Sequence, residues 1–551
     1  MTVQASQNRG KEARGERGRY APPLPLFVIL LIQSVTSLSL HNTAYRDEAL
    51  YLWAGHQLIH QWQGGPQTDD LSRFFSGLPY IYPVLGGWLD MIGGLEVARL
   101  FSLCCILTAT SIVYILTNSL YGERSAIFAS ALFAGQGSVL FLGHFATFDA
   151  MCLALLAGAA LLALKAGSVG YPEGAFLVGV MLLLAAATKY AGLLYVPSVL
   201  FLLGWQTQRR HGWPQAFLRV GIAFGVIALG AAVLLYFDDS ILAGINYTTL
   251  ERVAMGPAPQ WFLARRALSL GGGLAALALV GTLLDGNRSN RPLLIALLVT
   301  AFLAPIYHIV KSESISLHKH IAFGLFFAAP LAGYAVDRLS RFNLSTPRWH
   351  DLSNLRPLQS GWLAGAVVCL ALFTLGVCQA HQEFKGWQNS NAYIQALRAN
   401  VRPGDRILAE VVEVPGYYLQ DVVGQRQLSF FAYFKYTDPS GNDLYGEKAF
   451  QSAIAAGYFD MVILHYGDDA VMAHAIDPGL NDGKRYVLIV KQPGSWIWRK
   501  KNKATVQVKP AHRQASCFRS LRGYNLVRVC PVGGCARPAS PRSRATECPG
   551  A

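Results

Sequence analysis

Residues 216–237, AFLRVGIAFGVIALGAAVLLYF, decide the fold class of this chain because they are apolar over almost their whole length. A helix needs about 20 mostly apolar residues to cross about 30 Å of bilayer hydrocarbon, so this run predicts a membrane span. Similar runs recur along the chain up to residue 380. The sequence predicts about 11 spans in all, at residues 24–40, 97–119, 125–142, 149–164, 174–187, 192–205, 216–237, 264–284, 292–310, 321–336 and 361–380.

The composition indicates the same class of protein. Of the 551 residues, 52% are hydrophobic and 14% are charged, whereas charged residues make up about 25% of a soluble globular domain. A net charge of +15 would suggest a nucleic-acid partner for a soluble protein. In a membrane protein, surplus Lys and Arg usually lie in cytoplasmic loops. We therefore expect contacts with membrane lipids and no nucleic-acid partner.

The distribution of Lys and Arg predicts the orientation of the spans. Residues 1–23 are basic and precede the first span, so they are predicted to be cytoplasmic. They look like a signal peptide, but no small-x-small cleavage site follows, and we expect the first span to be retained. Alternate loops hold the cations of the predicted inner side, which are Arg124, Lys165, Arg209, Arg210, Arg288, Arg291, Arg338, Arg341 and Arg348. The long loop 41–96 is thereby placed on the outer face of the plasma (inner) membrane.

The character of the chain changes after residue 380. The predicted elements are helices at 391–400 and 447–456, strands at 406–412 and 459–465, and a hairpin at 485–491 and 495–500. Residues 24–380 are therefore expected to form an α-helical polytopic transmembrane catalytic domain. Residues 381–510 are expected to form a small extracytoplasmic α/β domain, since an odd number of spans precedes them.

Residues 511–551 are basic and show little periodicity, so they are predicted to be disordered. Four cysteines lie in this tail, at Cys517, Cys530, Cys535 and Cys548. They lack paired C-x-x-C spacing, which argues against zinc, while an extracytoplasmic disulfide stays open.

The first candidate site lies in the outer loop. It contains YRDEALY at residues 45–51, where Asp47 and Glu48 precede apolar residues at helical spacing. This pattern predicts an amphipathic helix at the interface with the acidic pair at its N-terminal end. The pair could instead only complement the helix dipole. The same loop supplies the further substrate-binding candidates Arg46, Tyr82, Asp69 and Asp70.

A second carboxylate and a lysine are predicted on the same face. Asp149 stands at the outer end of a span, where an ionisable side chain is costly unless it is paired or faces water. Its alternative role is the N-cap of the span that follows. Lys189 separates two short apolar runs, a pattern typical of a broken helix beside a polar cavity or of a snorkelling anchor.

The run SESISLHKH, residues 312–320, is the clearest cationic cluster predicted on the outer face. His318, Lys319 and His320 would bind a donor phosphate or anchor the span to headgroups. A carboxylate can accept a proton from an attacking hydroxyl while cations stabilise a phosphate leaving group. These residues therefore predict transfer from a lipid phosphate to an alcohol or amine. No dense metal-ligand motif is present, so no obligatory metal is expected and a divalent metal stays open.

The order of these motifs resembles the GT-C glycosyltransferases, more narrowly the family 39 and aminoarabinose-transferase-like group related to protein O-mannosyltransferases. The resemblance covers roughly residues 24–380. It rests on YRDEALY at 45–51, ARLFS at 98–102, LYGER at 120–124 and FATFDA at 145–150. The chain departs from the aminoarabinose transferases at GLPY, residues 77–80, where they commonly carry Lys-Pro-Pro. It also has Lys319-His320 where many members have Arg-Tyr.

The resemblance implies a polyprenyl-phosphate-linked sugar as donor and a lipid, glycan or protein as acceptor. It implies that Asp47 is the catalytic carboxylate or base, with Glu48 beside it and Asp149 as the second acidic residue. Inversion at the anomeric carbon would follow from direct displacement. The expected enzyme is a hexosyl- or pentosyltransferase. A transporter or flippase would also use intramembrane charges and broken helices, but no inverted repeat is visible. A non-catalytic envelope scaffold is the other alternative.

Overall fold

The computed structural model describes residues 23–68, 74–169, 172–251, 256–341, 357–431, 434–467, 470–492 and 495–501. The predictions for residues 1–22, for Asp69 and Asp70, and for the C-terminal tail with its cysteines lie outside these ranges. Five cysteines lie within them as free thiols, namely Cys104, Cys105, Cys152, Cys369 and Cys378.

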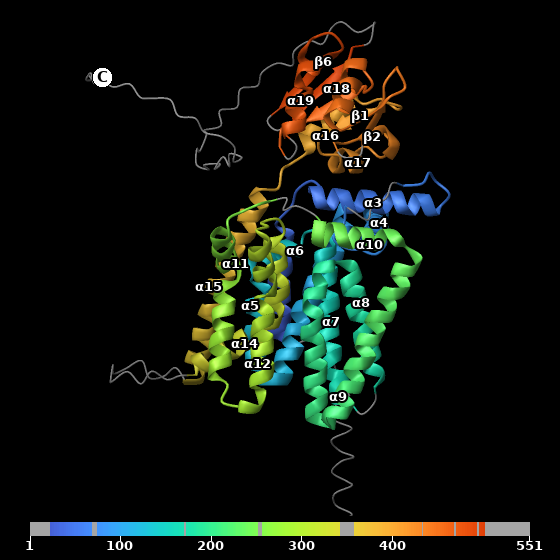
Figure 1. Cartoon of the computed structure of the whole chain (residues 1–551). Helices are drawn as coiled ribbons and strands as arrows, with labels where there is room; N and C mark the ends of the chain where they lie inside the picture. Colours follow the sequence, from blue (N-terminus) through green and yellow to red (C-terminus); the bar gives the residue numbers. More distant parts are fainter. Residues whose placement is uncertain are drawn as a thin grey trace, which may run out of the picture. The chain divides into compact units, whose positions relative to one another are not determined.

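The chain up to Lys385 is helical (Figure 1). Its elements are α2 Leu24–Leu38, α3 Arg46–Trp62, α4 Tyr82–Tyr121, α5 Glu123–Ala134, α6 Gly137–Leu142, α7 Phe148–Ser168, α8 Glu173–Thr188, η1 Tyr190–Tyr195, α9 Val196–Phe237, α10 Asp239–Asn246, η2 Tyr247–Glu251, α11 Gln260–Leu284, η3 Arg288–Asn290, α12 Arg291–Ala301, α13 Leu303–Lys311, α14 Leu317–Ser340 and α15 Pro357–Lys385.

Seven helical segments of the described residues are long and apolar enough to cross a membrane: Tyr82–Tyr121, Phe148–Ser168, Tyr190–Phe237, Gln260–Leu284, Arg288–Lys311, Leu317–Ser340 and Gly361–Lys385. Two shorter apolar helices, Leu24–Leu38 and Glu173–Thr188, accompany them. The chain is therefore a mostly helical, multi-pass membrane protein, as predicted.

Backbone breaks explain part of the difference between these segments and the predicted spans. The predicted spans 192–205 and 216–237 fall in one continuous segment, whose helix is broken at Gly212 with φ of 81°. The predicted span 125–142 is divided at Gly135 into α5 and α6. Helix α4 begins at Tyr82, inside the predicted outer loop, and is interrupted at Gly94, where φ is 71°. Glycine permits these left-handed conformations without a steric penalty.

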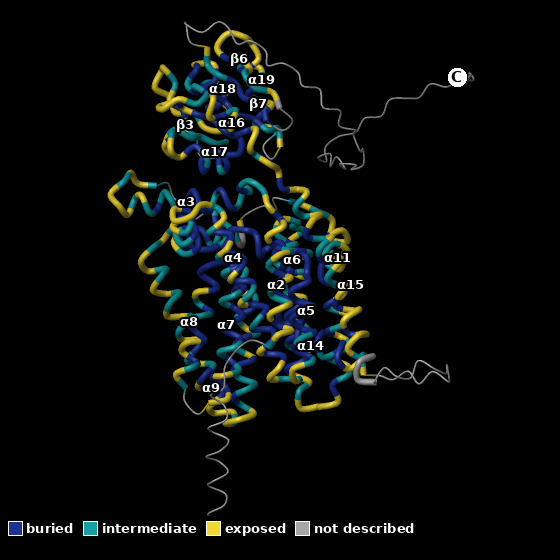
Figure 2. Tube along the Cα trace, turned by 180° about the vertical axis from the view of Figure 1, so that it is seen from behind, coloured by how far each residue is buried: buried dark blue, intermediate teal, exposed yellow. Residues whose placement is uncertain are grey.

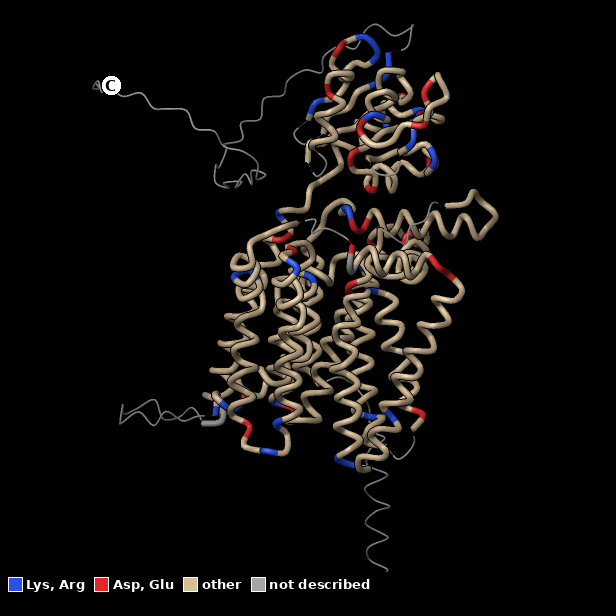
Figure 3. Tube along the Cα trace, in the orientation of Figure 1, with Lys and Arg blue, Asp and Glu red and all other residues tan. Residues whose placement is uncertain are grey.

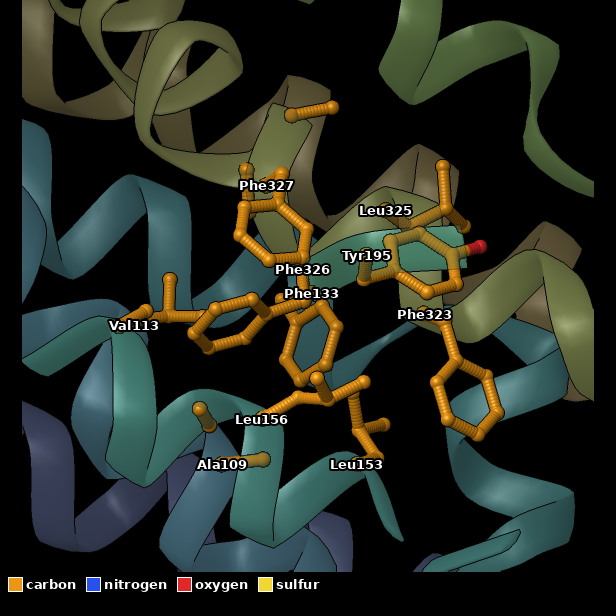
Figure 4. Close-up of a cluster of buried hydrophobic side chains, with 14 of the residues drawn as sticks. Ala109, Val113, Phe133, Leu153, Leu156, Tyr195, Phe323, Leu325, Phe326 and Phe327 are labelled. Carbon is orange, nitrogen blue, oxygen red and sulfur yellow. The ribbon is translucent and has the colours of Figure 1, made fainter. Parts of the chain in front are cut away.

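A large apolar cluster lies in the interior of the bundle, where Figure 2 shows buried residues along the helices. In Figure 4, Tyr195 lies against Phe323 and Phe327, with ring centroids 5.8 Å apart in both pairs. Stacked rings of this kind bury a large apolar area. They hold η1, which follows Lys189, against α14, which carries Lys319.

Charged residues gather toward the ends of the spans, with few between them (Figure 3). At one end, Asp337 accepts from Arg341 at 2.8 Å and lies 3.0 Å from Arg124. Residues Lys165, Arg209 and Arg210 line a single cavity of about 870 Å³. Loops that were predicted to share one side of the membrane thus lie together. Asp47, Asp149, Lys189 and Lys319 meet at the opposite end.

Residues after Lys385 form a smaller α/β part. Its elements are α16 Asn391–Asn400, β1 Ile407–Ala409, α17 Glu413–Tyr418, η4 Gln425–Gln427, β2 Leu428–Ser429, β3 Lys435–Thr437, β4 Asp443–Tyr445, α18 Gly446–Ala456, β5 Met461–Leu464, α19 Ala470–Asn481, β6 Tyr486–Gln492 and β7 Ser495–Lys500. The helices at 391–400 and 447–456 and the final hairpin are confirmed.

The main sheet has the order β2-β1-β5-β7-β6. Strand β1 pairs in parallel with β2 and β5, whereas β7 pairs antiparallel with β5 and β6. β3 and β4 form a separate antiparallel pair. This part contacts the helical part through α17, where Tyr417 donates to Asp90 Oδ1 at 2.8 Å.

Candidate active site

The site begins at the first turn of α3, which lies across the ends of the spans and not along them (Figure 1). Glu48 Oε2 accepts a hydrogen bond from the Tyr45 backbone N–H at 2.9 Å, which caps the helix. Successive side chains on an α-helix point about 100° apart. Asp47 and Glu48 therefore face different surroundings although they are adjacent in sequence.

Glu48 is fully buried, and each of its carboxylate oxygens accepts two hydrogen bonds from the protein. Its two oxygens accept from Arg99 Nε and Nη2, both at 2.9 Å. Oε1 also accepts from the Ala146 backbone N–H at 2.8 Å. Glu48 thus joins α3, α4 and the loop before α7, and the structure does not bring it to the charged cluster around Asp47.

Asp149 lies in the first turn of α7 and is fully buried. The helix begins at Phe148 after Thr147, so Asp149 is not the N-cap that its alternative role required. Its Oδ1 lies 2.6 Å from Lys189 Nζ, and its Oδ2 accepts from Thr147 at 3.1 Å. Lys189 stands at the break between α8 and η1, as the two short apolar runs predicted.

Lys319 connects this pair to Asp47. It lies in the first turn of α14, with Nζ 2.6 Å from Asp47 Oδ2 and 3.8 Å from Asp149 Oδ2. The result is an alternating row of charges, which we call the charged row: Asp47, Lys319, Asp149 and Lys189. Two carboxylates and two ammonium groups balance one another, and such balance is what permits charges to be buried.

Only one end of the charged row is open. The Asp47 side chain is 35% exposed, whereas those of Lys319 and Lys189 are 5% and 3% exposed and Asp149 is closed off. Lys189 Nζ also lies 4.3 Å from the centroid of the Phe148 ring, a cation–π contact. A substrate would therefore meet the Asp47 end of the row first.

His320 lies near Asp149 of the charged row and contacts a second histidine, His308. His308 Nδ1 lies 2.8 Å from the Glu313 carbonyl oxygen, so this nitrogen carries the proton. Its Nε2 lies 2.8 Å from His320 Nδ1, which must then be the donor when both rings are neutral. His320 Nε2 is left as a buried acceptor without a hydrogen-bond partner among the described residues. The predicted phosphate role of His320 would therefore require its protonation.

His318 faces elsewhere. Its Nδ1 lies 3.9 Å from Glu383 Oε2, and its ring packs edge-on against Phe141. Neighbours on one helix point in different directions, so the structure separates His318 from Lys319.

A short loop fixes the position of Lys189. The Leu78 N–H donates to the Ala187 carbonyl at 2.8 Å, and the Tyr190 N–H donates to the Ser76 carbonyl at 2.7 Å. Between them, a Cβ on Gly77 would lie 2.1 Å from the Thr188 carbonyl oxygen. In the GLPY run, which differs from the Lys-Pro-Pro of the aminoarabinose transferases, Gly77 packs so closely against the backbone at Thr188 that a side chain does not fit there.

The two remaining candidates that the structure describes, Arg46 and Tyr82, differ in their access to substrate. Arg46, together with Tyr45, Tyr393 and His465, lines a cavity of about 660 Å³ beside the start of α3. Tyr82 is fully buried, with its ring packed against Tyr51, so it is closed to substrate in this structure.

Arg99 of the ARLFS run and Gly77 of the GLPY run were not among the predicted site residues. Arg99 is buried and holds Glu48, and the signal for it was a cation inside an apolar run, which is expected to be paired. Gly77 gave no comparable signal, because its importance lies in a backbone contact with a segment more than 100 residues away.

Comparison with known sequences matches part of the chain to a family model. A family model described as dolichyl-phosphate-mannose-protein mannosyltransferase matches residues 91–236, which include Asp149 and Lys189. A comparison with curated protein sequences found no match.

Solved structures resemble most of the chain. ArnT from Cupriavidus metallidurans bound to undecaprenyl phosphate has a TM-score of 0.61 and 13% identity, over 88% of this chain and 98% of that one. The structure of ArnT from the same organism in the apo state has a TM-score of 0.59 and 12% identity, over 86% of this chain and 96% of that one. A third structure is the oligosaccharyltransferase AglB from Archaeoglobus fulgidus, in complex with an inhibitory peptide and a dolichol-phosphate. It has a TM-score of 0.51 and 13% identity, over 89% of this chain and 75% of that one.

The chain therefore has the GT-C fold, the fold of a class of membrane glycosyltransferases. The family model covers residues 91–236 alone, whereas the structural likeness extends over both the helical and the α/β parts.

Proposed function

We propose that this protein transfers a sugar from a polyprenyl-phosphate-linked donor to an acceptor at the outer face of the plasma membrane. The charged row is the observation that carries the proposal, because it places a reachable carboxylate next to two buried ammonium groups. ArnT, a structural neighbour, binds undecaprenyl phosphate. A lipid phosphate is thus a chemically matched partner for Lys319 and Lys189.

The reaction divides between the two ends of the row. Asp47 accepts the proton of an acceptor hydroxyl or amine, whose oxygen or nitrogen then attacks the anomeric carbon of the sugar. The bond between that carbon and the phosphate oxygen breaks, and its electron pair leaves with the polyprenyl phosphate. One displacement of this kind inverts the anomeric centre. The product phosphate carries one more negative charge than the donor, and nearby ammonium groups stabilise it.

The ion pair between Lys319 and Asp47 makes the two roles dependent on each other. A donor phosphate that takes Lys319 as its partner frees the Asp47 carboxylate to act as a base. Asp149 is fully buried and contacts both lysines, so its role is to position them and not to meet the acceptor.

The cavity beside Arg46 is the proposed acceptor site. Arg46, which lines this cavity, directly precedes Asp47 in the chain. The cavity is also lined by amide, hydroxyl and imidazole groups, including those of Gln388, Asn389, Ser390 and Tyr393. Such groups hydrogen-bond a hydroxyl-bearing lipid, glycan or protein.

The test is sugar transfer by the full-length protein in nanodiscs, offered a set of undecaprenyl-phosphate hexoses and pentoses. We expect release of undecaprenyl phosphate with one donor when acceptor lipids or glycans are added, and an inverted anomeric configuration by NMR. No release with any donor, together with no binding of undecaprenyl phosphate, would contradict the proposal.

A further inference from the structure

A second group of ligand-type side chains lies outside the charged row. His41 follows α2, Glu96 lies in α4 two residues after the break at Gly94, and His144 lies between α6 and α7. One ligand atom from each lies within 4.8 Å of the others. His41 Nδ1 and Glu96 Oε1 are 3.4 Å apart. The 3.4 Å separation is close to that of two ligand atoms about 2 Å from one tetrahedral ion.

His144 supplies an independent observation. It is 1% exposed, and neither of its ring nitrogens has a hydrogen-bond partner among the described residues. A buried polar group without a partner is costly, so native structures rarely leave one unsatisfied. His41 and Glu96 are exposed, which gives an ion a route from solvent to the buried ring.

The positive charge of Arg99 lies close enough to Glu96 to repel a bound metal cation. Its Nη1 lies 3.0 Å from Glu96 Oε1, and its other nitrogens are paired with Glu48. Among the described residues, Glu96 is contacted through Oε1, so its Oε2 is available to bind a metal.

We propose that His41, Glu96 and His144 bind one divalent transition-metal ion of the zinc type. Two imidazoles and one carboxylate are a common zinc donor set, in which water completes the four-coordinate shell. Magnesium and calcium prefer all-oxygen sites. The ion would join three segments that are separate in sequence.

The site also has a structural consequence, which rests on the proposed function. His41 precedes Asp47 by six residues, and His144 precedes Asp149 by five. An ion that ties His41 to His144 therefore fixes the segments that carry the two carboxylates of the charged row. It is a positioning site and does not touch the reacting atoms.

The experiment uses the full-length protein, purified without a polyhistidine tag, stripped with a chelator and supplied with zinc chloride. Metal content after desalting and competition with a zinc-binding dye measure stoichiometry and affinity. We expect one zinc per chain and a higher unfolding temperature with zinc, and neither effect with magnesium. His41→Ala and His144→Ala should each weaken binding at least about tenfold, and the exposed His381→Ala is the matched control.

Because His41 is exposed, its variant is expected to fold even if His144→Ala does not. No zinc retained by the wild-type protein, or unchanged affinity in His41→Ala, would overturn the proposal. These readouts need no sugar transfer, so failure of the proposed glycosyltransferase activity would be recognised separately.

Discussion

Lys319 Nζ lies 2.6 Å from Asp47 Oδ2 although 272 residues separate the two in the chain. The same ammonium group lies 3.8 Å from Asp149. One lysine therefore links the exposed carboxylate of α3 to the buried carboxylate of α7. This link connects proton transfer and phosphate binding in the proposed reaction.

Lys319→Met should weaken donor binding more than it affects stability, because its partner Asp47 is partly exposed and can be hydrated. Loss of one charged hydrogen bond to a phosphate should raise the Kd for undecaprenyl phosphate about tenfold to a hundredfold. Titration in nanodiscs measures this change. Lys385→Met, which removes an exposed lysine at the end of α15, is the control, and an equal loss in both variants would count against a phosphate role for Lys319.

Lys189→Met should destabilise the protein, because it leaves the Asp149 carboxylate buried without its closest partner. Removal of one member of a buried ion pair costs about 3–5 kcal/mol in the free energy of unfolding. The double variant Asp149→Asn with Lys189→Met should recover most of that stability, since no lone charge remains. Denaturant unfolding in detergent provides the measurement.

Sugar transfer should stay impaired in the double variant, because the phosphate has lost one cation. Recovery of both stability and transfer would show that the Asp149–Lys189 pair has only a structural role.

Glu48→Gln should lower stability more than Asp47→Asn does, because Asp47 is partly exposed and Asp149 still lies 3.8 Å from Lys319. Glu48 is fully buried between Arg99 and the Ala146 N–H, so the neutral amide leaves Arg99 without its main counter-charge at a cost of about 3 kcal/mol. Unfolding temperatures of the two variants, with exposed Glu447→Gln as a control, test the distinction. Equal unfolding temperatures for the Glu48 and Asp47 variants would refute the separate roles assigned to these neighbours.

Gly77→Ala should reduce transfer by displacing Lys189. The new Cβ would lie 2.1 Å from the Thr188 carbonyl oxygen, far inside van der Waals contact, so the loop or the lysine turn has to move. Gly221→Ala is the matched control, because a Cβ there meets nothing within 4 Å. We expect a lower kcat for Gly77→Ala and an unchanged kcat for Gly221→Ala, and equal rates would mean that the loop does not position Lys189.

The sequence was sufficient for features that depend on local pattern. Apolar runs predicted the helical membrane part, and the spacing after Asp47-Glu48 predicted α3. The final hairpin was found because Pro493-Gly494 separates two β-rich runs. Charge alternation also placed Asp47, Asp149, Lys189 and Lys319 at one end of the bundle, where the structure brings them together.

Side-chain direction and packing were beyond the sequence pattern. Glu48 and His318 adjoin Asp47 and Lys319 in the chain, but helical geometry turns them toward Arg99 and Glu383. The turn of the chain at Gly212 depends on a left-handed residue within a long helical segment, which apolar periodicity alone does not reveal. Partner identity across long sequence separations is set by tertiary packing, and a single sequence carries no direct record of it.

The most direct test of the central claim compares sugar transfer by Asp47→Asn and by Asp239→Asn, an exposed carboxylate in α10. A positioned general base increases the rate about 10²–10⁴-fold. Asp47→Asn should therefore lower kcat by that factor, while the variant still binds undecaprenyl phosphate. Asp239→Asn should keep the wild-type rate. Full transfer by a folded Asp47→Asn variant would contradict the assignment of Asp47 as the catalytic base.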